Sequence, residues 1–379
     1  MRRFGNSHST LKRLLKIIGL VFIFCLISWF LSSISSLKQQ NNTLNERLER
    51  IENKLGGSSK ITCNENDSIK KARQSVVRVV GGEAEGSGFA MNFMQNTIIT
   101  NFHVIEFEPS PKVIFPDNTF TTASIILADK DADIAVLKID KLIPNLTIGS
   151  SNELTPPSSV FALGYPLGGV LIGETSVIKG SYSARRNAKD INVSYIQTDA
   201  TYNGGMSGGP MIDECGYIVG MTTAGTGGLG LGISIETLKE KIIQMKLASD
   251  PLHDIVRINF QPNKSPLDAV SSFYNYLKIR KLESAFALLS DNFLKGGNFA
   301  QWKKGYQPLL DTTVIKIEAD KTKDNVVNVK LSTKNLIDDE IQYKYFEGWW
   351  EVKEVDGNLK LWQPKIREIE KPDYLWFYE

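Results

Sequence analysis

Between Ser75 and Ile235 the sequence consists of short apolar segments separated by turn residues, which limits this region to a fold built from strands. The 30 glycines of the chain cluster at 81–88, 164–173 and 204–232, where they bracket the apolar segments. No helical periodicity interrupts the pattern until Glu236–Met245, so a sandwich or barrel is indicated. Strands are predicted at Ser75–Val80, Ser87–Phe93, Thr97–Thr100, Ile134–Ile139, Val160–Leu163 and Tyr217–Thr222.

An apolar run from Ile17 to Leu31, extended by Ser32-Ser33-Ile34, precedes this region. Its length is close to that of a helix that crosses a bilayer. Five basic residues precede the run and only Lys38 follows closely, so the positive-inside rule places residues 1–16 in the cytoplasm. We expect a transmembrane helix at 17–34, a cell-membrane location and extracytoplasmic later domains. A cleaved signal peptide is the alternative, and it has the same consequence for those domains.

Residues 37–55 follow the apolar run and carry a short heptad pattern. A seam of fewer than three heptads predicts either a coiled coil that assembles the chain into an oligomer or a solvated stalk helix. Residues 56–66 read as a linker. The apolar positions of the seam are Leu37, Leu44, Leu48, Ile51 and Leu55.

The three cysteines do not form a disulfide framework, because Cys25 lies in the apolar run. Only Cys63 and Cys215 could pair, and we expect two unpaired thiols. No clustered His/Cys spacing indicates a structural zinc site.

The segment Gly205-Met206-Ser207-Gly208-Gly209-Pro210 places a serine between glycines. A serine hydroxyl is a poor nucleophile unless a base takes its proton and backbone amides bind the developing oxyanion. The flanking glycines let the backbone turn so that the Gly205 and Ser207 amides can point at one spot. Ser207 is therefore the candidate nucleophile, and a serine in an ordinary turn is the alternative.

A histidine and an aspartate complete a possible catalytic set. His103 follows a predicted strand and is a candidate general base, although such a histidine can also be structural. Asp133 leads into a buried strand, where it could hold the imidazole tautomer through the far ring nitrogen. Asp129 and Asp131 are nearby rivals for that role, and a solvated acidic turn is the alternative reading.

The order His, Asp, Ser, with separations of 30 and 74 residues, comes with a family resemblance over residues 70–248. It rests on Gly86-Ser-Gly-Phe, Thr100-Asn-Phe-His103-Val, Asp133-Ile-Ala-Val-Leu-Lys, Ile196-Gln-Thr-Asp-Ala, Gly205-Met-Ser207-Gly-Gly-Pro and Gly230-Leu-Gly-Ile-Ser-Ile-Glu-Thr-Leu. These segments resemble the HtrA/Deg branch of the trypsin-like serine peptidases.

The resemblance implies two six-stranded β-barrels with the active site in the cleft between them. It implies His103 as general base, Asp133 as its orienting partner and Ser207 as nucleophile. The Gly205 and Ser207 amides would form the oxyanion hole, and peptide bonds would be cut through an acyl-enzyme. It further implies no metal or cofactor, unfolded or peptide substrates, and a homo-oligomer, a trimer.

Two positions depart from the family pattern. Met206 stands where the family usually has asparagine, and only its backbone is expected to matter. Thr201 stands where enzymes that select basic residues carry an acid, so no preference for Lys or Arg at P1 is expected. Residues 183–194 fall where the family has a sensor loop, with a plain surface hairpin as the alternative. An α/β-hydrolase is the rival enzyme fold, but it requires the order Ser, Asp/Glu, His and helices between the strands.

Residues 260–370 show helical patterns first and strand patterns afterwards, which indicates an α+β domain. No good PDZ signature is found. The order of elements resembles the nuclear transport factor 2 superfamily, and we treat the domain as a binding or assembly module. Trp302, Trp349, Trp350 and Trp362 could line a pocket there or belong to the core. Helices are predicted at Pro266–Arg280, Leu282–Leu289 and Phe299–Tyr306, and strands at Thr313–Ala319, Val326–Ser332, Ile341–Val355 and Asn358–Glu368.

The sequence therefore predicts a membrane-anchored serine endopeptidase with a protease domain at residues 68–248. Its substrates would be misfolded or signalling proteins outside the cytoplasm. A latent or inactive protease-fold chaperone or scaffold, whose C-terminal domain binds a ligand or partner, is the alternative. A net charge of +2 without a basic stripe predicts no nucleic-acid partner.

Overall fold

The structure, a computed structural model, describes residues 38–39, 63–166, 173–226 and 229–377. The chain divides into two units, Met1–Thr62 and Cys63–Glu379. The predicted transmembrane segment 17–34 lies outside the described residues, as does the predicted coiled coil 37–55 apart from residues 38–39. Within the described ranges, no helix has both the length and the apolar character needed to cross a bilayer.

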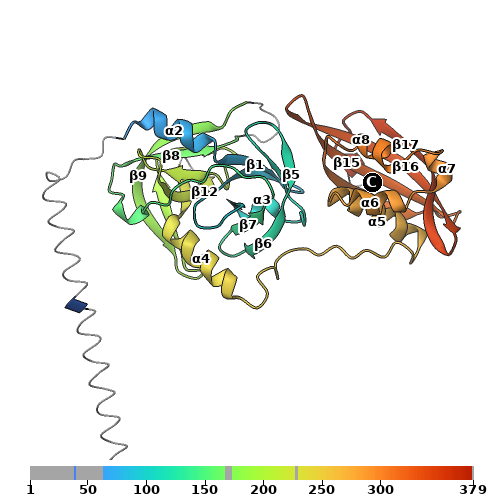
Figure 1. Ribbon diagram of the computed structural model, residues 1–379, viewed down its shortest axis with the longest axis horizontal. Helices are drawn as coiled ribbons and strands as arrows, with labels where there is room; N and C mark the ends of the chain where they lie inside the picture. The colour runs from blue at the N-terminus through green and yellow to red at the C-terminus, as the bar shows by residue number, and fades with distance from the viewer. Residues whose placement is uncertain (1–37, 40–62, 167–172, 227–228, 378–379) are drawn as a thin grey trace, which may run out of the picture. The chain divides into compact units, whose positions relative to one another are not determined.

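The first β-domain of the unit Cys63–Glu379 is an antiparallel sheet with the strand order β5-β4-β1-β2-β3-β7-β6 (Figure 1). It has seven strands, where the family resemblance implied six. Strand β5 pairs with β4 across a turn in which Asp117 accepts hydrogen bonds from the backbone N–H and hydroxyl of Thr119. The strands are β1 (Val76–Val80), β2 (Glu85–Phe89), β3 (Thr97–Thr100), β4 (Lys112–Ile114), β5 (Phe120–Thr122), β6 (Ser124–Asp129) and β7 (Ile134–Lys138).

The second β-domain is a closed six-stranded barrel with the order β10-β13-β12-β11-β8-β9. Six strands agree with the prediction for this half, and a closed sheet leaves no unpaired edge. The strands are β8 (Ser159–Gly164), β9 (Ser176–Ala188), β10 (Val193–Thr198), β11 (Pro210–Ile212), β12 (Ile218–Thr226) and β13 (Leu229–Ser234).

One apolar core continues from the first sheet into the barrel and joins the two halves. Phe89 of the first sheet and Phe161 of the barrel both belong to it and are fully buried. Helix α4 (Ile235–Leu247) covers this core with Leu238 and Ile242, which are spaced four residues apart on one helix face. The side chain of Ser234 caps the helix by accepting a hydrogen bond from the Thr237 amide.

The C-terminal region has helices first and strands afterwards, as predicted. Its sheet has the antiparallel order β14-β15-β16-β17, and α5 packs against this sheet (Figure 1). Phe273 and Leu277 of α5 are buried in the core between them. The elements are α5 (Pro266–Lys278), α6 (Leu282–Ala287), α7 (Asp291–Leu294), α8 (Phe299–Lys304), β14 (Leu309–Ala319), β15 (Val326–Ile337), β16 (Glu340–Val355) and β17 (Asn358–Ile369).

The tryptophans of this region divide between core and surface. Trp350 is 4% exposed, packs against Phe273 and donates a hydrogen bond from its indole N–H to the Tyr274 hydroxyl at 2.8 Å. Trp302 packs at the edge of the same core. Trp349 instead lines a hollow of about 630 Å³ on the sheet.

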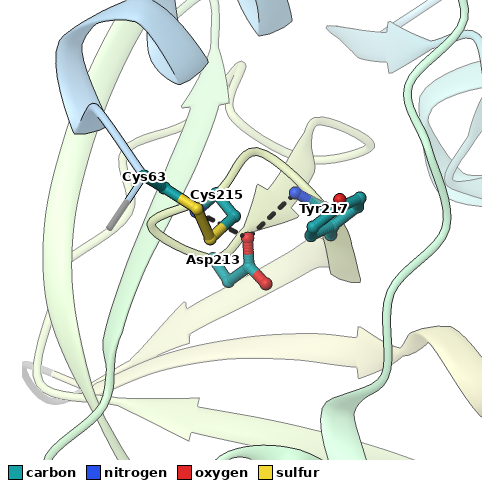
Figure 2. The surroundings of a disulfide bond; sticks show 4 residues. All are labelled: Cys63, Asp213, Cys215 and Tyr217. Atoms are coloured by element: carbon teal, nitrogen blue, oxygen red, sulfur yellow. Dashed lines mark hydrogen bonds between the residues drawn. A yellow bond between two sulfur atoms is a disulfide. The ribbon is translucent and has the colours of Figure 1, made fainter. Parts of the chain in front are cut away.

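Cys63 and Cys215 form a disulfide, so the expectation of two unpaired thiols is wrong (Figure 2). Cys63 precedes α2 (Glu65–Arg73), and Cys215 lies in the turn between β11 and β12. Asp213 shapes that turn, because its carboxylate accepts hydrogen bonds from the Cys215 and Tyr217 amides at 2.9 Å each. The sequence separation of 152 residues gave no local signal for this pairing.

Candidate active site

His103 lies on a short helix that follows directly from a buried strand. Strand β3 ends at Thr100, and α3 (Phe102–Ile105) begins two residues later. The neighbours Phe102 and Val104 are buried, whereas the His103 side chain is 44% exposed. The apolar neighbours thus anchor the helix and leave the imidazole facing out of the core.

Asp133 is the aspartate that the fold brings to the imidazole. Its Oδ2 lies 2.9 Å from His103 Nδ1, and its Oδ1 accepts a hydrogen bond from the His103 amide at 3.0 Å. Its backbone is left-handed, with φ of 56°, and the Asn101 side-chain amide donates to its carbonyl at 2.8 Å. The rivals point elsewhere: Asp129 accepts from the Ala132 amide, and no contact joins Asp131 to His103 in the described residues.

Thr223 is a third partner of this carboxylate, and sequence reasoning did not identify it. Its hydroxyl donates to Asp133 Oδ2 at 2.7 Å from strand β12. It therefore crosses from the second β-domain to a residue of the first. The Asp133 carboxylate is held by the imidazole, a backbone amide and a hydroxyl, which leaves it little freedom to turn away.

Ser207 lies close to this network, but its hydroxyl is directed away from the imidazole. Its Oγ donates to the Thr223 carbonyl oxygen at 3.1 Å, and among the described residues no hydrogen bond joins it to His103. The Thr223 residue therefore contacts both the nucleophile candidate, through its carbonyl, and Asp133, through its hydroxyl.

Ser87 fixes the backbone of the loop that carries Ser207. The Ser87 amide donates to the Ser207 carbonyl at 2.8 Å, and the Ser87 hydroxyl donates to the Gly205 carbonyl at 2.7 Å. The same hydroxyl oxygen accepts from the Tyr165 amide at 2.9 Å. The only sequence signal for Ser87 was its place in the segment Gly86-Ser-Gly-Phe.

The amides expected at the oxyanion hole are free in the structure. Neither the Gly205 nor the Ser207 N–H donates a hydrogen bond to any described residue. Gly205 has φ of 92°, which is the left-handed region that glycine adopts without strain. Two free amides on either side of Met206 can bind a developing oxyanion if they converge on it.

The residues around the serine show why glycine is needed there. A Cβ on Gly208 would lie 2.2 Å from the Ser87 carbonyl oxygen, and one on Gly209 would lie 2.0 Å from that of Leu163. The Met206 side chain is fully buried beneath the loop. The prediction that only the backbone of Met206 matters therefore applies to the catalytic step alone, because the side chain packs in the core.

Other predicted features lie at the rim. Thr201 is exposed, and the predicted sensor segment 183–194 forms the end of the β9–β10 hairpin. Burial, and after it the charge of Asp133, raises the pKa of the Tyr195 phenol above its ordinary value. Within the described residues no cluster of three or more His, Cys, Asp or Glu could hold a metal ion.

Comparison with known proteins gives a family for this region. Residues 86–221 match the family described as "Trypsin-like peptidase domain". The chain is 34% identical over 199 residues to "Protease Do-like 1, chloroplastic" of Arabidopsis thaliana, covering 48% of this chain and 44% of that protein. It is 33% identical over 218 residues to "Probable periplasmic serine endoprotease DegP-like" of Chlamydia muridarum, covering 56% and 42%.

A third relative, "Serine protease Do-like HtrA" of Bacillus subtilis, is 30% identical over 194 residues, covering 49% of this chain and 43% of that protein. The chain thus spans less than half the length of each of these relatives. Together with the fold, the matches show that this region is similar to the trypsin-like peptidase domain of serine proteases.

Proposed function

We propose that this chain hydrolyses peptide bonds in misfolded or signalling proteins outside the cytoplasm, with His103, Asp133 and Ser207 as its catalytic triad. One observation carries the proposal. The Asp133 carboxylate lies 2.9 Å from His103 Nδ1 and also accepts a hydrogen bond from the Thr223 hydroxyl, while the loop of Ser207 carries the two free amides of Gly205 and Ser207.

The chemistry follows from this arrangement. With its Nδ1–H bound to Asp133, the His103 ring presents Nε2 as a proton acceptor. Rotation about the Ser207 side chain moves Oγ from the Thr223 carbonyl to Nε2, and Oγ then attacks the scissile carbonyl as its proton passes to the ring. The Gly205 and Ser207 amides bind the oxyanion of the tetrahedral intermediate.

Collapse of that intermediate breaks the C–N bond. His103 gives its proton to the departing amine, and an acyl-enzyme on Ser207 remains. Water then attacks the ester with His103 again acting as base, which releases the carboxylic acid and regenerates the hydroxyl. The exposed Thr201 supplies no acid for a basic P1 residue, so we expect no preference for Lys or Arg. The resemblance to the HtrA/Deg family implies cleavage after small or medium apolar residues.

A second candidate function is a latent protease-fold scaffold whose C-terminal domain binds a ligand or partner. The observation in its favour is the bond from Ser207 Oγ to the Thr223 carbonyl, because a hydroxyl committed there is not activated by the imidazole. The two candidate functions predict different results in an activity assay. The peptidase turns over its substrate steadily, and the latent scaffold does not.

The remaining features of the function are part of the same proposal. The apolar run at 17–34 supports a single-pass anchor with residues 1–16 in the cytoplasm. The relative from Chlamydia muridarum is named a periplasmic endoprotease, which supports an extracytoplasmic site of action for this chain. Assembly as a trimer and a nuclear transport factor 2-like fold for residues 260–370 belong to the proposal as well.

The test uses the full chain purified in detergent, with unfolded casein as substrate and mass spectrometry to locate the cuts. We expect turnover by the wild type and its loss in both Ser207→Ala and His103→Ala. Removal of a triad member lowers the rate by on the order of 10⁴–10⁶, so the assay has ample range. Cleavage that persists in Ser207→Ala contradicts the assigned nucleophile, and a wild type without turnover favours the latent scaffold.

A further inference from the structure

The C-terminal region contacts the peptidase region through a small apolar cluster. Val80 and Ile114 of the first sheet are buried together with Leu310 of β14 and Ile341 of β16. Val80, Ile114 and Leu310 are each no more than 1% exposed. Val80 is the last residue of β1, so the contact reaches the turn between β1 and β2.

A buried group of four charges lies at the same interface. The Lys278 ammonium forms ion pairs at 2.7 Å with Glu108 and with Asp311. The Lys112 ammonium donates to the Lys278 carbonyl at 2.6 Å and lies 3.5 Å from Glu108. The Glu108 and Lys112 side chains are completely buried. We call these four residues, Glu108, Lys112, Lys278 and Asp311, the interface charge cluster.

Two more polar contacts join the C-terminal sheet to the β1–β2 turn itself. Lys334 of β15, 7% exposed, donates from Nζ to the Gly81 carbonyl at 3.0 Å. The Tyr343 hydroxyl of β16 donates to Glu85 Oε1 at 2.7 Å. Gly81 follows the last residue of β1, and Glu85 is the first residue of β2. The C-terminal domain thus holds both ends of this turn.

The β1–β2 turn approaches the segment of His103, and the first residues of β2 approach the segment of Ser207. A Cβ on Gly81 would lie 1.9 Å from the carbonyl oxygen of Val104, the residue after His103. A Cβ on Gly86 would lie 2.9 Å from the Ser207 carbonyl oxygen. Such close approach of backbone to backbone leaves no room for the turn to move without moving the segments that carry His103 and Ser207.

The interface charge cluster also contacts helix α3, at the same C-terminal end that Gly81 approaches. Glu108 follows α3, and its amide donates to the carbonyl of Ile105, the last residue of that helix, at 3.0 Å. Glu108 also accepts from the Ser110 amide at 2.9 Å, which fixes the loop. Helix α3 therefore has one contact with the C-terminal domain through Gly81 and another through Glu108.

We propose that Lys334 and Lys278 are positioning residues of the active site, which couple the C-terminal domain to His103 and Ser207 through Gly81 and Glu108. The docked C-terminal domain is therefore required for the full catalytic rate of the peptidase. Its release lowers the catalytic rate and leaves the binding of short peptides unchanged. The proposal rests on the proposed peptidase function, because its kinetic effect is read in turnover.

The first experiment compares Lys334→Met with the wild type, both as full chains in detergent, on a short chromogenic peptide chosen from the mapped cuts. Methionine keeps the apolar stem of the lysine and removes the donor to Gly81. We expect kcat to fall about tenfold with KM within about twofold, since only the transition state needs the aligned residues. Lys334→Arg keeps a donor and is expected to recover most of kcat.

Two further variants protect the result against simple misfolding. Tyr343→Phe removes only the hydroxyl that reaches Glu85, and we expect a fall in kcat of about threefold. Lys365→Met is the matched control, because Lys365 is exposed on β17 of the same sheet and far from the β1–β2 turn in its strand pairing. It is expected to keep both kinetic constants. Equal kcat in the wild type, Lys334→Met and Tyr343→Phe overturns the proposal.

Hydrogen exchange read by mass spectrometry tests the coupling without any turnover. We expect Lys334→Met to speed exchange at residues 81–87, 102–108 and 204–209 and to leave the β9–β10 hairpin unchanged. Faster exchange confined to the C-terminal domain overturns the coupling, even when the wild type is active. If the wild type shows no turnover, the proposed function fails, and this exchange pattern alone decides for or against the coupling.

Discussion

Lys278 is the residue whose loss should most disturb the unit Cys63–Glu379, because it stands between two buried carboxylates. Glu108 is completely buried and Asp311 is 2% exposed, and each lies 2.7 Å from the Lys278 ammonium. Burial lowers the pKa of Lys278, but Asp311 and Glu108 outweigh that effect and keep the pKa above its ordinary value. The lysine is therefore charged, and Lys278→Met removes the positive charge that both acids share.

The magnitude follows from the burial of the acids that remain. Removing one partner of a buried ion pair costs about 3–5 kcal/mol, because it leaves a charge without compensation in a poorly solvating site. Without Lys278, Glu108 still has Lys112 at 3.5 Å, whereas Asp311 loses its 2.7 Å ion pair and keeps only the longer-range charges of Lys112 and Lys334. We expect Lys278→Met to destabilise the C-terminal domain by about 3–5 kcal/mol, and to lower its unfolding midpoint by about 6 °C or more.

The assay follows tryptophan fluorescence during thermal unfolding of the full chain in detergent. Five of the six tryptophans lie between residues 302 and 376, so the signal reports mainly on the C-terminal domain. Lys344→Met is the control, since Lys344 forms a half-exposed pair with Glu368 at 3.3 Å, and such pairs contribute less than about 1 kcal/mol.

A double variant supplies the result that would refute this reasoning. Lys278→Met combined with Asp311→Asn removes one charge of each sign and leaves Glu108 facing Lys112 at 3.5 Å. The double variant should therefore be less destabilised than the sum of the two single variants, by about 2 kcal/mol. Additive effects, or a Lys278→Met midpoint within 2 °C of the wild type, would show that the cluster is not a compensated set of charges.

Three further predictions concern acid, the carboxylate network and the disulfide. Burial raises the pKa of Asp311, but Lys278 and Lys112 outweigh it and hold the pKa below the ordinary 3.8. A carboxylate whose pKa is lowered by folding stabilises the folded protein at pH values above the pKa of the unfolded chain. This part of the stability is lost as pH falls below about 4. Asp311→Asn should remove that acid-dependent loss, as measured by thermal unfolding. Thr223→Val removes the 2.7 Å bond to the Asp133 carboxylate and should lower kcat about tenfold with little change in KM, measured on the chromogenic peptide. Cys215→Ser should destabilise the peptidase domain by about 2–5 kcal/mol in thermal unfolding without reductant, while adding reductant to that variant should have no further effect.

Local patterns were enough to predict six of the thirteen strands that the structure describes in the peptidase region, namely β1, β2, β3, β7, β8 and β12. Strand β3 has the predicted bounds, Thr97–Thr100, because its four residues are all β-branched and such residues favour strands. The contact between His103 and Asp133 was also predicted, and the sequence could place these residues because each adjoins a strong strand signal. Their roles in catalysis remain predictions until the variants are measured.

Contacts between residues far apart in the chain were not predictable in the same way. Thr223 reaches Asp133 across 90 residues, and nothing in a threonine within a strand marks it as a partner of a carboxylate. The Cys63–Cys215 pair and the docking of Lys334 on Gly81 depend on how separate elements pack. Three strands of the first sheet, β4, β5 and β6, were not predicted, and β4 and β5 have only three residues each, which are too few to show a period.

The Cys63–Cys215 disulfide closes a covalent ring that contains both His103 and Ser207. If the enzyme nicks itself at any single bond between residues 63 and 215, the two pieces stay joined through the sulfurs. The nicked molecule then migrates as one species on a non-reducing gel and separates into two bands only after reduction. A cut before Cys63, in contrast, frees the whole peptidase from the N-terminal segment. Self-cleavage inside the ring therefore leaves the two pieces joined by the disulfide, whereas self-cleavage before Cys63 separates the peptidase from the N-terminal segment.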